Sequence, residues 1–213
     1  MLSFRGTLLA IVCLGFTATG RAWADPAQVD YVEDPYADHV TRGTTARVGT
    51  AVGFVYGERI DAVAIGGTTA FGQRFGRLTI EAELAMLALE GRNAGPHLGD
   101  AERLGVLARY DVLRLGPRWV GGNSLFSIYV EGGAAVAWNH WYQPAANEEP
   151  RIVPGDTKRV EGQAGVGVML EHRLQEPVSF PKRIGWYLGW RVALAPHQSD
   201  PATVCRGVVC DRV

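Results

Sequence analysis

The stretch Thr45-Ala-Arg-Val-Gly-Thr-Ala-Val-Gly-Phe-Val-Tyr56 alternates between two kinds of residue and so predicts a β-strand. Its two faces would carry Ala46, Val48, Val52, Phe54 and Tyr56 on one side, and Arg47, Gly49, Ala51 and Gly53 on the other. A soluble sheet usually presents Lys, Thr, Ser and Glu to water on its polar face. A face of small residues with single charges instead suits the crowded interior of a narrow barrel whose apolar side meets lipid.

Six further segments repeat this period of two, which gives seven predicted strands. Each reaches the roughly 9–11 residues that a tilted membrane strand needs. Two of them, Leu78–Glu90 and Arg103–Leu115, also suit a helix by composition or capping, but a helix over the second would have no clean apolar stripe. We therefore predict an all-β, antiparallel, up-and-down transmembrane β-barrel. The predicted strands are Thr45–Tyr56, Asp61–Phe71, Leu78–Glu90, Arg103–Leu115, Phe126–Tyr142, Val160–His172 and Ile184–Ala195.

The N-terminus has the pattern of a cleaved export signal. Arg5 supplies a positive charge, an apolar core follows, and Ala22-Trp-Ala24 is a small-x-small cleavage motif. The apolar run is shorter than the roughly 20 residues of a membrane-spanning helix. We expect residues 1–24 to be removed, 25–43 to form a flexible acidic arm, 44–196 to form the barrel and 197–213 to form an extracellular tail.

Seven is an anomalous number of strands. Bacterial single-chain barrels have an even number of strands, and eight is the smallest. After Ala195 the chain runs through His197–Val213 and stops where an eighth strand would begin. We favour truncation before the last strand; the alternatives are that a segment such as Gln28–Glu33 closes the seam, or that the barrel stays open.

The longer polar connections all fall at one end of the predicted barrel. They are Gly91–Glu102, Gln143–Arg159 and the tail from Pro196 onward. Outer-membrane barrels have short periplasmic turns and longer outside loops. This end is therefore expected to lie outside the cell.

Two Gly-rich alternating strings, Ile128-Tyr-Val-Glu-Gly-Gly-Ala-Ala-Val-Ala-Trp138 and Ala164-Gly-Val-Gly-Val168, carry a resemblance to a known group. Together with the export signal, the chain resembles the small eight-stranded outer-membrane barrels, the OmpA-like and OmpX-like group. The resemblance implies a monomeric barrel with a packed interior. It also implies insertion by the barrel-assembly machinery of the outer membrane.

Ionisable side chains on the predicted inner face form the main candidate site. Unpaired buried charges are very costly, so these groups are expected to form a salt-bridged network. Three arginines against a larger number of acids predict an excess of negative charge. A cation-preferring or gated pore is one reading; a polar plug is preferred, since an eight-stranded interior is just wide enough for side chains to fill. The predicted inner residues are Arg47, Glu81, Glu83, Arg109, Asp111, Glu131, Glu161, Gln163, Glu171 and Arg191.

Other candidate sites are weaker. Cys205 and Cys210 are expected to form a disulfide in an oxidising compartment, and no metal site or cofactor is expected. His197 and Ser199, with an Asp nearby, could in principle support acyl transfer, and they loosely resemble barrel enzymes that deacylate lipid A. The dispersed histidines His97, His140 and His172 are expected to be surface or interfacial residues.

The leading functional hypothesis is a non-enzymatic outer-membrane β-barrel with a structural or loop-mediated interaction role. Its expected partners are outer-membrane lipid and an unidentified extracellular molecule that contacts Gln143–Arg159 and the tail. Removal of residues 1–24 takes away Arg5 and Arg21 and no acids, so the formal net charge falls from −1 to −3, which argues against a nucleic-acid partner. The alternatives are a soluble exported lipocalin-like barrel, with residues such as Val48, Val52, Val166, Val168, Leu188 and Trp190 around an apolar ligand, and a lipid-A-modifying enzyme.

Overall fold

The protein is all-β in the computed structural model, which describes residues 7–21, 43–56, 61–91, 96–116, 124–143, 151–173, 183–195, 203–206 and 209–212. The described part of the chain contains strands and turns but no helix. Accordingly, no helix in these ranges is long and apolar enough to cross a membrane.

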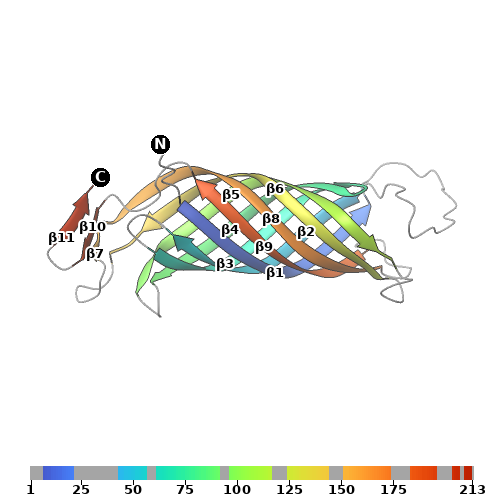
Figure 1. The fold of residues 1–213 in the computed structure, drawn as a ribbon, viewed down its shortest axis with the longest axis horizontal. Helices are drawn as coiled ribbons and strands as arrows, with labels where there is room; N and C mark the ends of the chain where they lie inside the picture. Colours follow the sequence, from blue (N-terminus) through green and yellow to red (C-terminus); the bar gives the residue numbers. More distant parts are fainter. Residues whose placement is uncertain are drawn as a thin grey trace.

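Eight antiparallel strands form a closed barrel in the order β1-β2-β3-β4-β5-β6-β8-β9 (Figure 1). Each strand pairs with its neighbour in the chain, and β1 also pairs with β9 to close the circle. The strands have 13 to 19 residues, more than a membrane crossing needs. Their bounds are β1 Thr7–Arg21, β2 Gly43–Tyr56, β3 Asp61–Phe75, β4 Leu78–Gly91, β5 His97–Leu115, β6 Ser124–Trp141, β8 Gly155–Arg173 and β9 Arg183–Ala195.

The seven strands predicted from the sequence are confirmed, including the two segments that could also have been helices. The ends differ, because the alternation continues into segments that looked like polar connections. Strand β3 runs on to Phe75, β5 begins at His97, and β8 begins at Gly155 rather than Val160. The predicted external loop Gln143–Arg159 therefore contributes its last five residues to the barrel wall.

The eighth strand is β1, which lies in the segment that the sequence assigns to a cleaved export signal. In the register, Val12 faces Val52 of β2 on one side and Trp190 of β9 on the other. The expectation that the eighth strand is missing is therefore wrong, and the barrel extends beyond residues 44–196. The other suggested closing segment, Gln28–Glu33, lies outside the described residues. Cleavage after Ala24 stays a prediction, and it would remove β1 from the wall.

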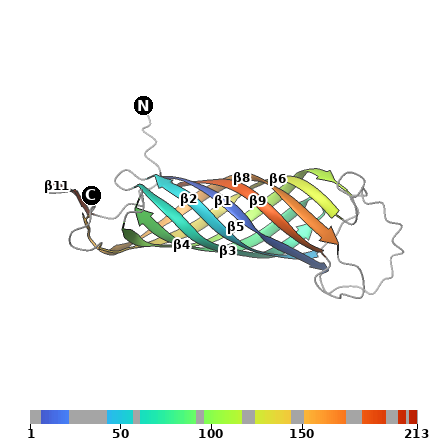
Figure 2. The same cartoon turned by 90° about the horizontal axis from the view of Figure 1, so that it is seen from below.

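The two ends of the barrel differ. At one end, here called the β7 end, a small sheet of β7 (Arg151–Ile152), β10 (Thr203–Arg206) and β11 (Val209–Arg212) projects past the wall (Figures 1 and 2). At the other end, here called the Gly76 end, β3 and β4 meet in a two-residue turn. Gly76 adopts φ +62° there, a conformation that suits glycine in a tight hairpin.

The side chains divide between two faces as the alternation predicts. On the outside lie large apolar residues, such as Val48, Phe71 and Trp186, each at least 60% exposed. On the inside lie small and charged residues; Arg47, Glu81 and their neighbours on the same face are buried. The predicted inward and outward faces of the strands are therefore confirmed.

We predict that β1 is needed for a closed barrel. A chain that starts at Asp25 loses the strand between β2 and β9 and leaves two unpaired edges. After refolding in detergent it should no longer run as a compact species in an unboiled gel, whereas the full chain should. As a control, removing residues 203–213 takes away no strand of the barrel and should leave the compact species intact. A compact Asp25 chain would show that the seam closes in another way.

Candidate functional site

The barrel interior is lined with charged side chains. The eight predicted network residues are all at most 8% exposed, and so are Gln163 and Glu171; the eight are Arg47, Glu81, Glu83, Arg109, Asp111, Glu131, Glu161 and Arg191. Each projects to the inside because it lies in phase with the small residues of its strand. Every predicted interior residue therefore lies inside the barrel.

Three buried arginines were missed by the sequence analysis. Arg74 lies past the predicted end of its strand, Arg159 fell in a predicted loop, and Arg103 is the first residue of a predicted strand. All three continue the inward phase of their strands, so the available signal was the unbroken alternation. With them, the described residues hold six buried arginines and six buried acids, so the predicted excess of negative charge is wrong.

The central cluster ties opposite walls together. Arg191 of β9 forms ion pairs with Glu83 of β4, which is not a neighbouring strand, and with Glu131 of β6 at 2.8 Å. Arg47 of β2 contacts Glu81 of β4 at 2.5 Å. These contacts cross the space inside the barrel instead of following its wall. Ion pairs that span the interior fill it with side chains.

Two tyrosines pack beside this cluster. The guanidinium carbon of Arg47 lies 5.1 Å from the ring centre of Tyr187, and that of Arg109 lies 5.3 Å from the ring centre of Tyr129. The Tyr129 ring occupies the space above Gly167 on the next strand, where an added Cβ would lie 2.4 Å from the tyrosine hydroxyl. Glycine on one strand thus makes room for a large inward side chain on its neighbour.

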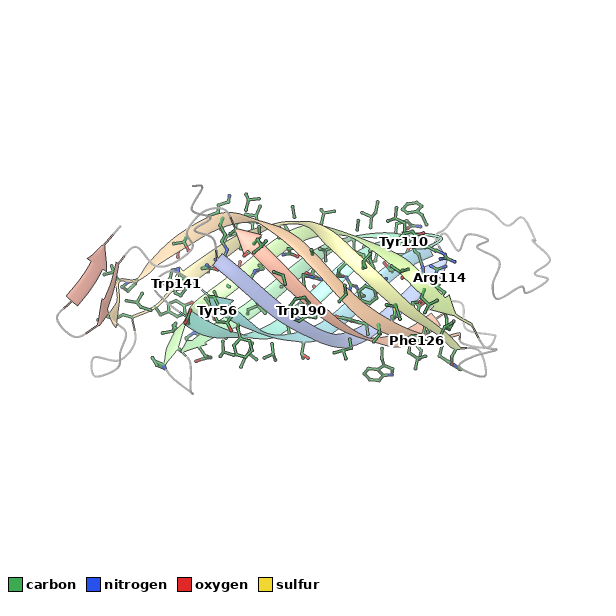
Figure 3. The ribbon with its side chains drawn as sticks, in the orientation of Figure 1. Tyr56, Tyr110, Arg114, Phe126, Trp141 and Trp190 are labelled. Atoms are coloured by element: carbon green, nitrogen blue, oxygen red, sulfur yellow. The ribbon has the colours of Figure 1, made fainter. Side chains whose placement is uncertain are left out.

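A second cluster closes the Gly76 end. Arg74 forms ion pairs with Asp111 at 2.7 Å and with Glu171 at 2.8 Å. Arg114 also reaches Asp111 at 2.7 Å, and its guanidinium donates to the carbonyl of Gly76. Figure 3 shows Arg114 close to this end of the barrel. Two arginines and two carboxylates balance here.

A third cluster lies toward the β7 end. Arg103 of β5 and Arg159 of β8 both contact Glu161, through Nε at 3.0 Å and 2.6 Å. All three side chains are at most 4% exposed. Two arginines therefore share a single carboxylate.

Beyond this cluster the interior becomes apolar. Buried apolar side chains gather at the β7 end, and Trp141 among them donates its indole N–H to Thr157 at 3.1 Å (Figure 3). This apolar plug consists of Val55, Leu87, Leu89, Leu98, Trp141 and Ile152. The sequence signal for the plug was the inward phase of Leu87 and Leu89, which follow Glu81 and Glu83 on the same face of β4.

The weaker candidates are distributed around the rim. His97 contacts Glu90 at 2.9 Å and His140 contacts Asp156 at 2.9 Å, while His172 lies 3.2 Å from Ser124. The described ranges contain no group of three or more residues suited to holding a metal ion. The register places Cys205 opposite Cys210 between β10 and β11, and their disulfide stays a prediction. His197 and Ser199 lie outside the described residues.

One hydrogen bond at the rim changes the pKa of a tyrosine side chain. Tyr142 follows β6 directly and donates its hydroxyl to Asp100 at 2.7 Å. This hydrogen bond to a carboxylate, more than any other influence, raises the pKa of the Tyr142 phenol above its ordinary value. The contact joins the start of β5 to the end of β6 at the β7 end.

Aromatic side chains lie on the outer face toward both ends. Phe54 and Tyr56 lie near the β7 end, and Phe71 and Trp186 lie near the Gly76 end. Tyr110 pairs with the first residue of β4, so it also lies at the Gly76 end (Figure 3). Trp190 lies near the middle of the barrel (Figure 3).

We predict that, among the ion-pair residues of the central cluster, substitution of Arg191 lowers the free energy of unfolding the most. Arg191→Met removes the charge that neutralises Glu83 and Glu131, and breaking a buried pair from one side costs about 3–5 kcal/mol. The free energy of unfolding, measured with urea in detergent, should fall by that amount. Glu83→Gln added to Arg191→Met should recover part of the loss, since it removes one of the stranded charges. Purely additive losses would contradict a direct pair.

Arg114→Met provides the control. Arg114 is 17% exposed at the side chain, and Arg74 still neutralises its partner Asp111. The decrease in the free energy of unfolding caused by Arg114→Met should be clearly smaller than that caused by Arg191→Met. Equal losses would mean that the network acts through overall packing instead of individual charge pairs.

Comparison with known proteins finds no matching family model, no matching curated protein and no matching solved structure. The inner and outer faces of the barrel wall and its two ends are therefore the features that bear on function.

Proposed function

We propose that the protein is a non-enzymatic outer-membrane β-barrel that acts as an envelope structural element or presents its β7 end to a partner. The observation that carries the proposal is the outer face. Large apolar side chains are exposed on all seven strands whose side chains are described, with examples such as Val52, Ile65 and Leu84. Aromatic residues lie on the same face toward both ends, as expected of the interfacial zones of a membrane.

The solvent around the outer face decides whether this barrel is stable. Burial of apolar surface is favourable by roughly 25 cal/mol per Å², and monomeric soluble proteins rarely expose apolar patches larger than a few hundred Å². An apolar belt around a whole barrel is therefore unfavourable in water and favourable in hydrocarbon. A closed barrel also pairs its backbone groups across strands, as a sheet in lipid requires.

The filled interior supports a structural role over transport. Ion pairs such as Arg191–Glu83 cross the lumen, and the apolar plug occupies the β7 end. The described interior has no excess of negative charge, so the basis for the cation-preferring pore inferred from the sequence is gone. Lipid and the barrel-assembly machinery are the partners that this proposal implies. The proposed contact surface for a further partner is the β7 end with the sheet of β7, β10 and β11; residues 144–150 of the expected contact region lie outside the described residues.

A lipocalin-like barrel is the second candidate, and the facing of the side chains disfavours it. It needs residues such as Val48, Val166 and Leu188 around an internal ligand. These three side chains are between 47% and 60% exposed on the outer face. A lipid-modifying enzyme is the third candidate; replacing His197 and Ser199 with Ala should leave lipid A acylation unchanged.

Membrane fractionation tests the proposal. The protein should sediment with outer membranes and should be extracted by detergent but not by salt or alkali. Recovery in the soluble periplasmic fraction would contradict the proposal and favour the lipocalin-like alternative.

A pair of matched substitutions tests the lipid-facing surface itself. Val166→Arg places a charge at mid-strand on the outer face and should lower the free energy of unfolding in lipid vesicles by about 2–4 kcal/mol. Val153→Arg is the control, because Val153 is similarly exposed, at 53% against 50%, but lies between β7 and β8 outside the barrel wall. Val153→Arg should leave the free energy of unfolding in lipid vesicles almost unchanged. Equal costs would mean that Val166 does not face hydrocarbon.

A further inference from the structure

Arg103 and Arg159 lie in one row across three adjacent strands. Arg103 pairs in register with Ala137 of β6, and Ala137 pairs on its other side with Arg159 of β8. Ala137 is fully buried and carries only a methyl group between them. The next inward row is Gly105, Ala135 and Glu161, so small residues again lie beside the carboxylate. The two guanidinium groups thus converge on Glu161 over a floor of small side chains.

Several guanidinium nitrogens of this cluster have no hydrogen-bond partner in the described part of the chain. Nη1 and Nη2 of Arg103 and Nη1 of Arg159 are buried without a hydrogen-bond partner among the described residues. Glu161 accepts only from the remaining guanidinium nitrogens, at 2.5 Å from Nη2 of Arg159 and 3.0 Å from Nε of Arg103. Buried polar groups in folded proteins almost always have a partner. Three buried donors of this cluster are therefore without a partner among the described residues.

The charge balance distinguishes this cluster from the others. In the central cluster Arg47, Arg109 and Arg191 face three glutamates, and at the Gly76 end two arginines face two acids. Arg47 and Arg109 of the central cluster also have donors without a hydrogen-bond partner within the described ranges, but that cluster is neutral and water would satisfy them. Near the β7 end two arginines face only Glu161. When the partly exposed Arg114 is counted with the six buried arginines, the three clusters hold seven arginines against six acids, and the cluster with more arginines than acids is this one.

An arginine cannot relieve such an imbalance by losing its proton. Burying an unpaired charge costs several kcal/mol even after relaxation. The next carboxylate toward Arg103 is Glu83, and it is already paired with Arg191. The cluster therefore needs one additional negative charge that can accept hydrogen bonds.

We propose that Arg103 and Arg159 hold a small monovalent anion of the size of chloride inside the barrel, above Ala137 and beside Glu161. The anion accepts the three free N–H groups and neutralises the surplus charge. A larger anion has no room, because the walls of an eight-stranded barrel leave little space beyond the side chains. The site belongs to the closed interior, so it holds in detergent or lipid alike and does not depend on the proposed function.

Halide-dependent stability is the first test. The full chain is refolded in a nonionic detergent and unfolded with urea, while chloride or bromide replaces gluconate at constant ionic strength. The folding equilibrium constant should increase about tenfold for each tenfold rise in halide above its dissociation constant. Arg103→Gln should abolish the dependence. Arg74→Gln, which alters a balanced cluster, should lower the overall stability but keep the dependence.

A covalently attached anion is the second test. Ala137→Glu places a carboxylate between the two arginines, and Ala137→Gln is the control of nearly equal size and shape. Without halide, the Glu variant should be more stable than the Gln variant, and the Glu variant should no longer respond to halide. If the Gln variant is equally or more stable, the surplus charge is already neutralised within the chain and the proposal is wrong.

A crystal of the unmodified protein grown in bromide gives a readout that needs no variant. An anomalous peak within hydrogen-bond distance of the Arg103 and Arg159 guanidinium groups is expected. No peak there, together with a flat halide response, would overturn the proposal. Either result is independent of membrane fractionation, so the anion site and the proposed function can fail separately.

Discussion

The structure depends on one constraint, which is that every strand of a closed barrel has only two faces. Each backbone group is committed to a neighbouring strand, so a side chain either points out or points into a lumen that eight strands make very narrow. Apolar side chains as large as Trp186 and Leu188 can occupy the outside in succession. What points inward must both fit and be electrically neutral as a group.

The interior meets these two demands together. Space is made by small residues opposite large ones: Gly167 beneath the Tyr129 ring, and Ala137 between Arg103 and Arg159. Neutrality comes from pairs that reach across the lumen, such as Arg74 with Glu171. The same contacts that balance charge also hold opposite walls at a fixed distance. This is why a polar core can serve a barrel in the way an apolar core serves a soluble domain.

Closure of the barrel requires one more strand between β2 and β9, and the sequence of that strand must suit the position. Strands β2 and β9 leave two edges that need a partner, and an apolar segment of about the same length can satisfy both. Thr7–Arg21 has that length and a continuous apolar run, and it also has the composition of an export signal. The two roles exclude each other in one molecule, because a segment cut away cannot remain in the wall. The short apolar length typical of an export signal is also sufficient for a barrel strand.

The sequence by itself determined the strands and their faces, because the period of two is a local property that survives any arrangement of neighbours. It placed Arg47, Glu81 and Glu131 inside and the valines outside. Only the tertiary structure decided which charges meet: Arg191 and Glu83 are 108 residues apart on strands that are not adjacent. Strand ends and the closing strand were also decided by the tertiary structure, since pairing with a neighbour sets how far each strand extends. The additional arginines Arg74, Arg103 and Arg159 continue the inward phase of their strands and so join the charges of the core.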